Sequence, residues 1–479
     1  MNLRANKTRI VCTVGPASSS PEVMRAMIRA GMDVARLNFS HGDFAGHRQV
    51  IEGLRAAARA EGRRLAIMAD LPGPKMRIGQ LAEEPVTLAP GDRFTLTTED
   101  VVGNAGRASV TFSRLPQAVK QGDILFLNDG NIQLEVERVI GADVECRVVV
   151  GGELRSRKGL NLPGIDLGIS AFTERDRECV AFAAEQGIDA LSQSFVESAT
   201  DIEDLRAAAA LLGYHPFVIA KIERSRARDN LDGILRVSDG IMIARGDLGV
   251  EIPIENIALA QKYLVRLANI AGKPVITATQ MLESMTTNRR PTRAEATDVA
   301  NAILDGSDCV MLSGESAMGR YPVEAVAMLA GIAAAIEPLR PALRVRDILR
   351  ASDRQAATDL TDLIASSVDN VLERISPALV IVPTHGGHSA RRLARLRPEA
   401  WIVAVSASER TCQQLQFSYG VHPVHEPEHP DDWNAYARKL LATFGLEGRL
   451  VVLTEGPSSK RPEANHRMEI IDLGRAEQS

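Results

Sequence analysis

The chain has 479 residues, a length that at about 150 residues per domain suggests roughly three domains. Its 56 Lys and Arg against 61 Asp and Glu give a net charge of −5, and aromatic residues make up only 4%. A nucleic-acid partner is therefore not expected, because the chain lacks both a basic excess and aromatic stacking platforms. The longest nearly apolar stretch, 325–336, is shorter than the ~20 residues that cross a bilayer, so no membrane span is predicted.

The N-terminus and the cysteines indicate a cytoplasmic protein. The apolar run at 10–14 is too short for a signal peptide. The five cysteines are odd in number and form no C-x-x-C pair, which is typical of buried thiols in a reducing compartment, without structural zinc.

Eight short apolar strand candidates alternate with helical patterns. The strands are expected at 8–14, 33–37, 65–69, 189–192, 217–221, 240–243, 274–277 and 308–312. Helices are expected at 21–30 and 44–61, and S/T-x-x-E capping boxes at Thr200/Glu203 and Thr292/Glu295 start two more. Eight βα units predict a closed (β/α)₈ TIM barrel with its active site at the carboxyl ends of the strands.

Two further regions interrupt or follow this pattern. Turn-punctuated alternating runs at 92–97, 124–127, 132–139 and 144–150 predict a small β-barrel lid domain inserted into a barrel loop. Strand patterns at 378–383, 401–405, 450–454 and 468–471 predict a C-terminal α/β domain with an open sheet. We therefore expect the barrel at 1–73 and 169–340, the lid at 74–168 and the third domain at 341–479.

Charged residues at two neighbouring strand ends suit a metal site. Lys221 and Glu223 lie two apart, so both would face the barrel mouth. Glu223 and Asp247 could hold Mg²⁺, which commonly takes one or two carboxylates plus substrate oxygens, and Gly246 lets the backbone approach a ligand. The alternatives are an ion pair that only closes the barrel and, around Asp247, a turn with a capping carboxylate.

Other predicted strand ends and the loops behind them supply more polar residues: Arg36, Asn38, Ser40, Asp70, Arg77, Thr279, Gln280, Ser313 and Glu315. Any one of them is more often a cap or a surface group. Together they place two arginines, a lysine and at least four carboxylates around one mouth, which suits metal-assisted phosphoryl transfer. A Walker A motif is absent, since Gly272-Lys273 is followed by Pro274.

Several ordered strings carry a family resemblance: RLNFSHG at 36–42, KIE at 221–223, ARGDLGVEIP at 244–253, TQMLESM at 279–285, RPTRAE at 290–295 and MLSGE at 311–315. Over residues 7–340 the chain resembles pyruvate kinases, and the likeness is weaker beyond. Two other readings are a Mg²⁺-dependent barrel lyase that forms a pyruvate enolate and a non-catalytic effector-binding homologue. The lid residue Lys158 argues against a lyase, and intact Lys221, Glu223, Asp247 and Thr279 argue against a dead enzyme.

The resemblance implies phosphoryl transfer from phosphoenolpyruvate to ADP, giving ATP and pyruvate, the final step of glycolysis, by a cytoplasmic homotetramer using Mg²⁺ or Mn²⁺. It implies a metal on Glu223 and Asp247 and a proton route through Thr279, Ser313 and Glu315. The implied phosphoenolpyruvate contacts are Arg36, Arg77, Lys221, Gly246, Asp247 and Thr279, and the implied nucleotide contacts are His41, Arg77, Lys158 and Asn38.

One departure concerns potassium. In many relatives potassium ligands match Asn38, Ser40, Asp70 and Leu71, and a Glu stands where this chain has Lys75. The chain is similar to the potassium-independent branch, in which a tethered ammonium replaces the ion, so activity without potassium is expected. The alternative is that Lys75 is a surface substitution.

A second departure concerns regulation. Residues 384–391 resemble the family's sugar-phosphate loop, with Thr384 and Ser389 as candidate contacts at a helix N-terminus. The last loop, 454–462, lacks the usual Gly-rich stretch. A sugar phosphate, a nucleotide or no effector are all left open, as is a plain turn.

Overall fold

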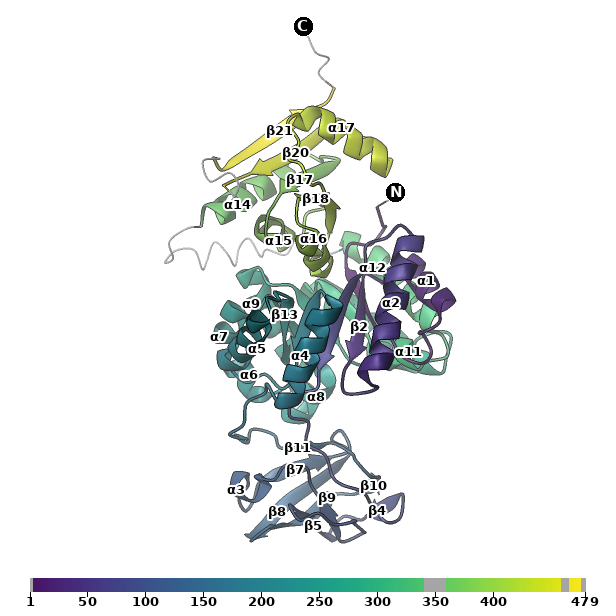
Figure 1. Cartoon of the computed structure of the whole chain (residues 1–479), viewed down its shortest axis with the longest axis vertical. Helices are drawn as coiled ribbons and strands as arrows, with labels where there is room; N and C mark the ends of the chain where they lie inside the picture. Colours follow the sequence, from purple (N-terminus) through teal and green to yellow (C-terminus); the bar gives the residue numbers. More distant parts are fainter. Residues whose placement is uncertain (1–2, 340–358, 458–464, 475–479) are drawn as a thin grey trace.

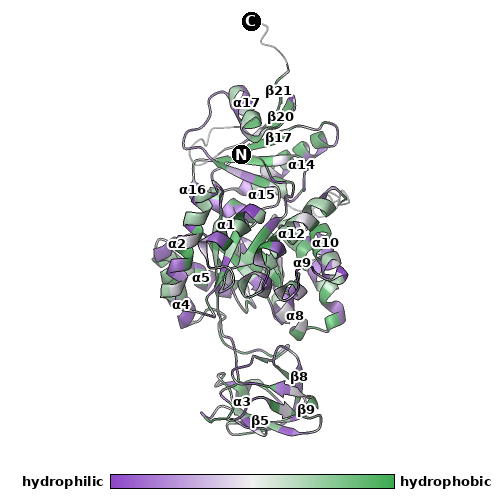
Figure 2. Ribbon diagram, turned by 90° about the vertical axis from the view of Figure 1, so that its right-hand side faces the viewer, coloured by the Kyte–Doolittle hydropathy of each residue, from purple (hydrophilic) through white to green (hydrophobic). Residues whose placement is uncertain are grey.

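The computed structural model describes residues 3–339, 359–457 and 465–474. Three parts follow one another along its long axis: a small β region, a central barrel and a C-terminal α/β sheet (Figure 1). Apolar residues concentrate on the barrel strands and on the central strands of the C-terminal sheet (Figure 2). The order of the parts in space therefore differs from their order in the chain, because the β region is inserted into the barrel sequence.

The central part is a closed barrel of eight parallel strands. They are β1 (Arg9–Thr13), β2 (Val34–Asn38), β3 (Ala66–Leu71), β12 (Ala190–Gln193), β13 (Phe217–Ile222), β14 (Gly240–Ala244), β15 (Val275–Ala278) and β16 (Cys309–Leu312). Their order around the barrel is β1-β16-β15-β14-β13-β12-β3-β2. The predicted (β/α)₈ barrel is confirmed, with each strand within two residues of its expected bounds.

Helices cover the outside of the barrel. They are α1 (Pro21–Ala30), α2 (Phe44–Ala60), α4 (Glu174–Gln186), α5 (Ala199–Leu211), α7 (Leu231–Val237), α9 (Ile257–Ala271), α10 (Arg293–Asp305) and α12 (Pro322–Ile336). Short helices α6 (Ser225–Asp229), α8 (Arg245–Glu251) and α11 (Gly314–Ala317) follow strand ends at the mouth.

Of the two predicted capping boxes, the one at Thr292 and Glu295 is confirmed. The box at Thr200 is wrong, because the cap of α5 is Ser198 and its partner is Asp201. The Asp201 carboxylate accepts the Ser198 N–H at 2.9 Å, so the helix begins two residues earlier than expected.

Helix α12 with its terminal 3₁₀ turn (Glu337–Leu339) is, within the described residues, the one segment long and apolar enough to cross a membrane. This is weak evidence, since core helices of soluble proteins pass the same test. Its residues Ala325, Val326, Leu329 and Ala333 are buried in the barrel core. The apolar character of α12 is thus explained in part by packing.

The inserted region is built from short strands: β4 (Val86–Leu88), β5 (Arg93–Thr97), β6 (Arg107–Ser109), β7 (Ile124–Leu127), β8 (Ile132–Ile140), β9 (Asp143–Val150), β10 (Gly152–Leu154) and β11 (Leu160–Asn161), with one helical turn, α3 (Leu115–Ala118). They form a six-stranded sheet, β11-β7-β8-β9-β5-β6, and a two-stranded sheet, β10-β4, around one core. The predicted β lid is present, with its ladders divided between two sheets.

The C-terminal part is an open sheet in the order β19-β18-β17-β20-β21. Its elements are α14 (Leu360–Leu372), β17 (Leu379–Pro383), α15 (His388–Ala394), β18 (Trp401–Ser406), α16 (Glu409–Gln414), β19 (Val421–His425), α17 (Trp433–Phe444), β20 (Leu450–Glu455) and β21 (Arg467–Asp472). Four strands were expected. The edge strand β19 was missed, because His422 and Pro423 interrupt its apolar pattern, and proline is tolerated at an edge.

The C-terminal sheet packs on the amino-terminal face of the barrel, opposite the mouth. The Cys309 thiol at the start of β16 lies 3.3 Å from the Phe417 carbonyl, and the Arg397 guanidinium pairs with Asp308 at 2.8 Å. Phe217 and Phe417 stack across this contact with ring centroids 5.1 Å apart. The expected domain boundary at 340/341 lies outside the described residues, and the other boundaries remain predictions.

Candidate active site

Asp70 is the centre of a buried charge network at the barrel mouth. Its carboxylate accepts hydrogen bonds from Arg36 Nε at 2.8 Å and Ser192 Oγ at 2.8 Å, and it lies 3.2 Å from Lys221 Nζ. Burial alone would raise the pKa of Asp70, but Arg36 and Lys221 outweigh it and lower the pKa to about 2. Asp70 therefore holds the two predicted cations in place from β3, between β2 and β13.

Lys221 is held as an ammonium although it is buried. Its Nζ lies 2.8 Å from Glu223 Oε1 and donates to Ser194 Oγ at 2.7 Å. Burial lowers the pKa of Lys221, but the carboxylates of Asp70 and Glu223 raise it by more. A fixed, charged ammonium facing the mouth suits the binding of a phosphorylated anion.

Glu223 and Asp247 form a pair of acidic oxygen donors. Burial raises the pKa of Glu223, Lys221 opposes this shift, and repulsion from Asp247 adds to it. The Phe195 N–H donates to Glu223 Oε2 at 2.8 Å. Among the described residues no three His, Cys, Asp or Glu side chains gather as a metal site. A two-carboxylate site still fits Mg²⁺, whose remaining ligands come from water and substrate, and a cation would relieve the repulsion.

The turn after β15 brings Thr279 against the start of α8. Thr279 has a φ of 75°, a strained backbone conformation for a β-branched residue. Arg245 holds it there by donating to the Thr279 carbonyl at 2.8 Å while pairing with Asp298 at 2.7 Å. A Cβ on Gly246 would lie 2.7 Å from Thr279 Cγ2, so only glycine fits this close approach.

The Glu315 carboxylate supports the loop that follows this turn. It is fully buried, and its two oxygens accept the N–H groups of Leu282 at 3.0 Å and Ser313 at 2.8 Å. The carboxylate thus ties the loop after Thr279 to the end of β16.

A second group of cations lies around His41. Burial lowers the pKa of His41, and the charges of Arg77, Lys75 and Arg36 lower it further. The three cations, which are expected at the barrel mouth, therefore all lie near enough to His41 to lower its pKa. Lys75 itself is exposed at the segment that leads into the lid.

Arg77 and Lys158 belong to the base of the lid. Arg77 Nη1 donates to the Arg157 carbonyl at 2.9 Å, and Arg77 forms an isolated β-bridge with Gly159. The Lys158 carbonyl accepts the Ile78 N–H at 2.9 Å.

The residues at the predicted potassium position are already engaged. Asn38 Oδ1 accepts the Ser40 N–H at 3.1 Å. Leu71 is 1% exposed, and its carbonyl accepts the Ser194 hydroxyl at 2.6 Å. Asp70 is likewise paired with Arg36 and Lys221.

Ser192, Ser194, Phe195 and Arg245 were missed by the sequence reasoning. Ser192 and Ser194 alternate at the end of β12, a spacing that places both side chains on one face and was a usable signal. Phe195 contributes through its backbone and carries no such signal.

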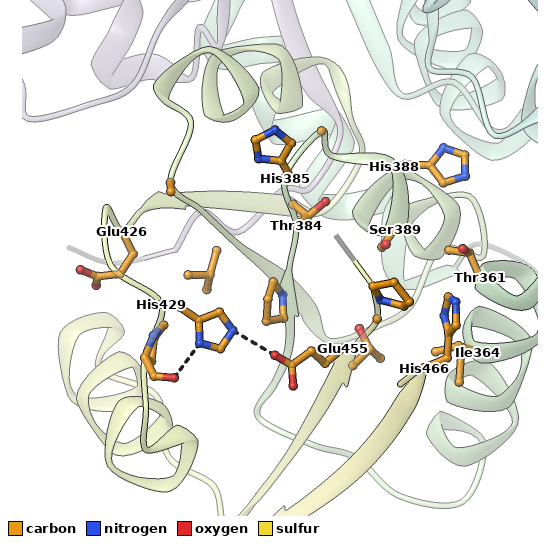
Figure 3. A pocket seen from close by; sticks show the side chains of 18 of the residues that line it. Thr361, Ile364, Thr384, His385, His388, Ser389, Glu426, His429, Glu455 and His466 are labelled. Carbon is orange, nitrogen blue, oxygen red and sulfur yellow. Dashed lines mark hydrogen bonds and ion pairs between the residues drawn. The ribbon is translucent and has the colours of Figure 1, made fainter. Parts of the chain in front are cut away.

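A cavity of about 340 Å³ opens in the C-terminal sheet (Figure 3). It lies where β17, β18 and β20 end, and Thr384, Ser389 and Glu455 line it. Thr384 Oγ1 accepts the Gly387 N–H at 3.0 Å. His429 Nε2 lies 2.9 Å from Glu455 Oε1. No Lys or Arg of the described residues lines the cavity; residues 458–462 of the last loop lie outside the described part.

An eight-stranded parallel barrel whose mouth pairs buried cations with a carboxylate pair defines a class of protein, a (β/α)₈-barrel enzyme that acts on phosphorylated anions. Family profiles narrow this class: the pyruvate kinase barrel domain matches residues 5–326 and the pyruvate kinase alpha/beta domain matches residues 362–471. The chain belongs to the pyruvate kinase family and is a phosphotransferase.

Individual relatives agree with the profiles. A pyruvate kinase of Thermococcus litoralis is 46% identical over 99% of this chain and 100% of its own length. One of Geobacillus stearothermophilus is 42% identical over 94% of this chain and 77% of its own. The crystal structure of a pyruvate kinase from Cryptosporidium parvum superposes with a TM-score of 0.91, at 35% identity, covering 98% and 96% of the two chains. Pyruvate kinases generally use Mg²⁺.

Proposed function

We propose that the family reaction, phosphoenolpyruvate plus ADP to pyruvate plus ATP, takes place at this mouth and that Arg36, Lys221 and Thr279 carry it. The supporting observation is the buried network in which Asp70 fixes the Arg36 guanidinium and the Lys221 ammonium side by side. Preorganised cations stabilise charge on a transferring phosphoryl group without reorganising during the reaction.

The substrate's carboxylate would lie on the backbone N–H groups of Gly246 and Asp247 and on the Thr279 hydroxyl. The absence of a Cβ at Gly246 and the held turn at Thr279 support this placement. The nucleotide would lie between His41, Asn38 and Arg77, with Lys158 above its phosphates when the lid closes.

Glu223 and Asp247 would hold Mg²⁺, or Mn²⁺ in its place. When bound, the ion supplies positive charge to the phosphoryl group and to the enol oxygen. The Lys221 ammonium, 2.8 Å from Glu223, favours the ionised form of that carboxyl, which is the form that a metal requires.

In the reaction, a β-phosphate oxygen of ADP forms a bond to phosphorus while the bond from phosphorus to the enol oxygen breaks. The electron pair stays on that oxygen, and Lys221 and Arg36 stabilise the charge. A proton then adds to the terminal carbon; we assign its delivery to Thr279 through water. Ser313 and Glu315 support this route by holding the loop after Thr279.

We further propose that the enzyme needs no potassium, because Lys75 supplies charge near the substrate phosphate. Its effect on His41 and the engagement of Asp70 and Leu71 support this. Turnover in potassium-free buffer is expected to equal turnover with potassium, and Lys75→Glu is expected to lower it there. Large activation of the wild type by potassium, or unchanged turnover in the variant, would contradict the proposal.

The C-terminal cavity is proposed as an effector site, with Thr384 and Ser389 as phosphate contacts. It lies at the point where the strand order reverses between β17 and β20, the usual ligand crevice of an open α/β sheet. Titration with sugar monophosphates, bisphosphates and AMP tests this; a response to none of them would remove the effector role.

The central experiment measures pyruvate from phosphoenolpyruvate with Mg²⁺, with and without ADP. We expect pyruvate only when ADP is present. Pyruvate formed without ADP would favour a hydrolase, and none at all would favour a lyase with another substrate or a binding protein. A cytoplasmic location and a homotetramer complete the proposal; the five buried free cysteines support the former.

A further inference from the structure

Arg224 directly follows Glu223 and is buried where the chain returns from the lid to the barrel. The residue is 2% exposed. Its Nη2 donates to the carbonyl of Ile165 at 2.8 Å and to that of Leu162 at 3.3 Å. These carbonyls belong to the return hinge, residues 162–166, which connects the last lid strand, β11, to the segment before α4. One side chain at the barrel mouth thus donates hydrogen bonds to two backbone carbonyls of the hinge.

The same guanidinium is paired with carboxylates of two other elements. Arg224 Nε lies 2.9 Å from Glu197 Oε1 and 3.9 Å from Glu251 Oε2. Glu251 is the last residue of α8, the helix whose first turn carries Gly246 and Asp247. Arg224 therefore touches the hinge and α8 while its backbone continues from Glu223.

Arg226 adds an outer pair to this cluster. Its Nη1 lies 2.8 Å from Asp166 Oδ2 in the hinge and 3.3 Å from Glu197 Oε2. The lid also approaches α8 directly, since a Cβ on Gly130 would lie 3.2 Å from Val250 Cγ2. Arg224 thus donates to two carbonyls of the hinge, and Arg226 adds an ion pair with the hinge residue Asp166.

We propose that Arg224 is a positioning residue that fixes the return hinge and links the position of the lid to the carboxylates of Glu223 and Asp247. A buried guanidinium cannot lose its charge, so it must keep its partners or leave the site. A hinge movement that takes Leu162 and Ile165 away would therefore disturb the ion pair with Glu251 at the end of α8. The link to the carboxylates rests on their proposed metal role; the hold on the hinge does not.

Arg224→Gln tests this in the full-length protein. Amide hydrogen exchange at 162–166, measured without substrates, is expected to rise roughly tenfold, because local opening of the hinge becomes easier. The Mg²⁺ concentration for half-maximal activity is expected to rise severalfold. Arg224→Lys should restore only part of the hinge protection and part of the Mg²⁺ response. The lysine ammonium lacks the planar guanidinium that reaches carbonyl and carboxylate groups together.

Arg397→Ala is the matched control, because it removes a buried, ion-paired arginine on the opposite face of the barrel. It should leave exchange at 162–166 unchanged. Unchanged hinge exchange in folded Arg224→Gln, or an equal rise in Arg397→Ala, would overturn the proposal. Faster amide exchange at 162–166 in Arg224→Gln with an unaltered Mg²⁺ dependence of activity would overturn the proposed link between Arg224 and the carboxylates.

If Arg224→Gln does not fold, Arg224→Lys replaces it, with a smaller rise expected at the same amides and no rise overturning the proposal. An inactive wild type with a protected hinge would refute the proposed function alone, since the exchange measurement needs no activity.

Discussion

Asp70 shows how one buried carboxylate organises the chemistry of the mouth. It touches no predicted substrate, yet it orders Arg36 and Lys221, and both its oxygens are hydrogen-bonded. The cations in turn stabilise its ionised form. Neighbouring Glu223 shows the opposite shift, because burial and Asp247 together outweigh Lys221. Two carboxylates that lie 3.2 Å and 2.8 Å from one lysine ammonium thus have pKa values shifted in opposite directions.

Acid should therefore remove stability through Asp70. Its pKa of about 2 lies below the ordinary 3.8, so the ionised form stabilises the fold above the ordinary value, and this stabilisation is lost as pH falls through about 2. The difference corresponds to about 2 kcal/mol. The unfolding free energy of the wild type, relative to that of Asp70→Asn, should fall by this amount between those pH values. Asp229→Asn, an exposed change on α6, should leave the acid dependence of the wild type intact; an identical dependence in Asp70→Asn would exclude Asp70 as its cause.

At the scale of an element, α10 depends on its amino-terminal cap. Thr292 Oγ1 accepts the Glu295 N–H at 3.2 Å, and the Glu295 carboxylate accepts the Thr292 N–H at 2.7 Å. The Glu295 carboxylate also accepts the Ser284 N–H at 2.7 Å, which joins the helix to the loop after Thr279. This cap supports both the helix and the site.

Thr292→Ala should destabilise the start of α10 by about 1 kcal/mol, because it leaves a helix N–H without a partner. Hydrogen exchange in the first turn of α10 measures the loss directly. Thr297→Ala removes a hydroxyl within the same helix that bonds only to the Arg293 carbonyl, so it should have little effect. Equal exchange in both variants would show that the cap contributes nothing of its own.

At the scale of the whole molecule, two exposed apolar patches support the proposed homotetramer. The barrel patch consists of Ile254, Leu259 and Tyr263, which are 68%, 66% and 48% exposed. The sheet patch consists of Leu360, Leu363 and Ile470, which are 56%, 48% and 48% exposed. Two separate self-complementary interfaces per subunit are what a tetramer with three two-fold axes requires.

Sedimentation should accordingly give a mass about four times the 51.7 kDa of the chain. Leu259→Glu and Leu363→Glu should each halve that mass, and the double variant should sediment as a monomer. Leu211→Glu, at the last residue of α5, which is 86% exposed and belongs to neither patch, should remain tetrameric. A monomeric wild type, or dissociation by Leu211→Glu, would contradict the assignment of the patches.

Two details differ from the local predictions for different reasons. The cap of α5 is Ser198, whose N–H reaches the Asp201 carboxylate within the same helix start, although Thr200 carries a similar motif. Strand β19 forms because β18 offers a free edge to a segment with a poor strand pattern. The choice of cap is therefore made locally, whereas the neighbouring strand overrides the local preference at β19.

Local periodicity by itself determined the barrel, because eight alternating strand and helix patterns have few other ways to bury their apolar residues, and it determined the sites of Lys221, Glu223, Asp247 and Thr279 at strand ends. Only the tertiary structure decided how these side chains are charged and held. Three sets of contacts join residues far apart in the chain: those of Asp70 with its cations, the hydrogen bond from Arg245 to Thr279, and the hydrogen bonds from Arg224 to the hinge. Burial and ion pairing set the pKa values and the contact energies of these side chains, and both arise only when the strands close into one barrel.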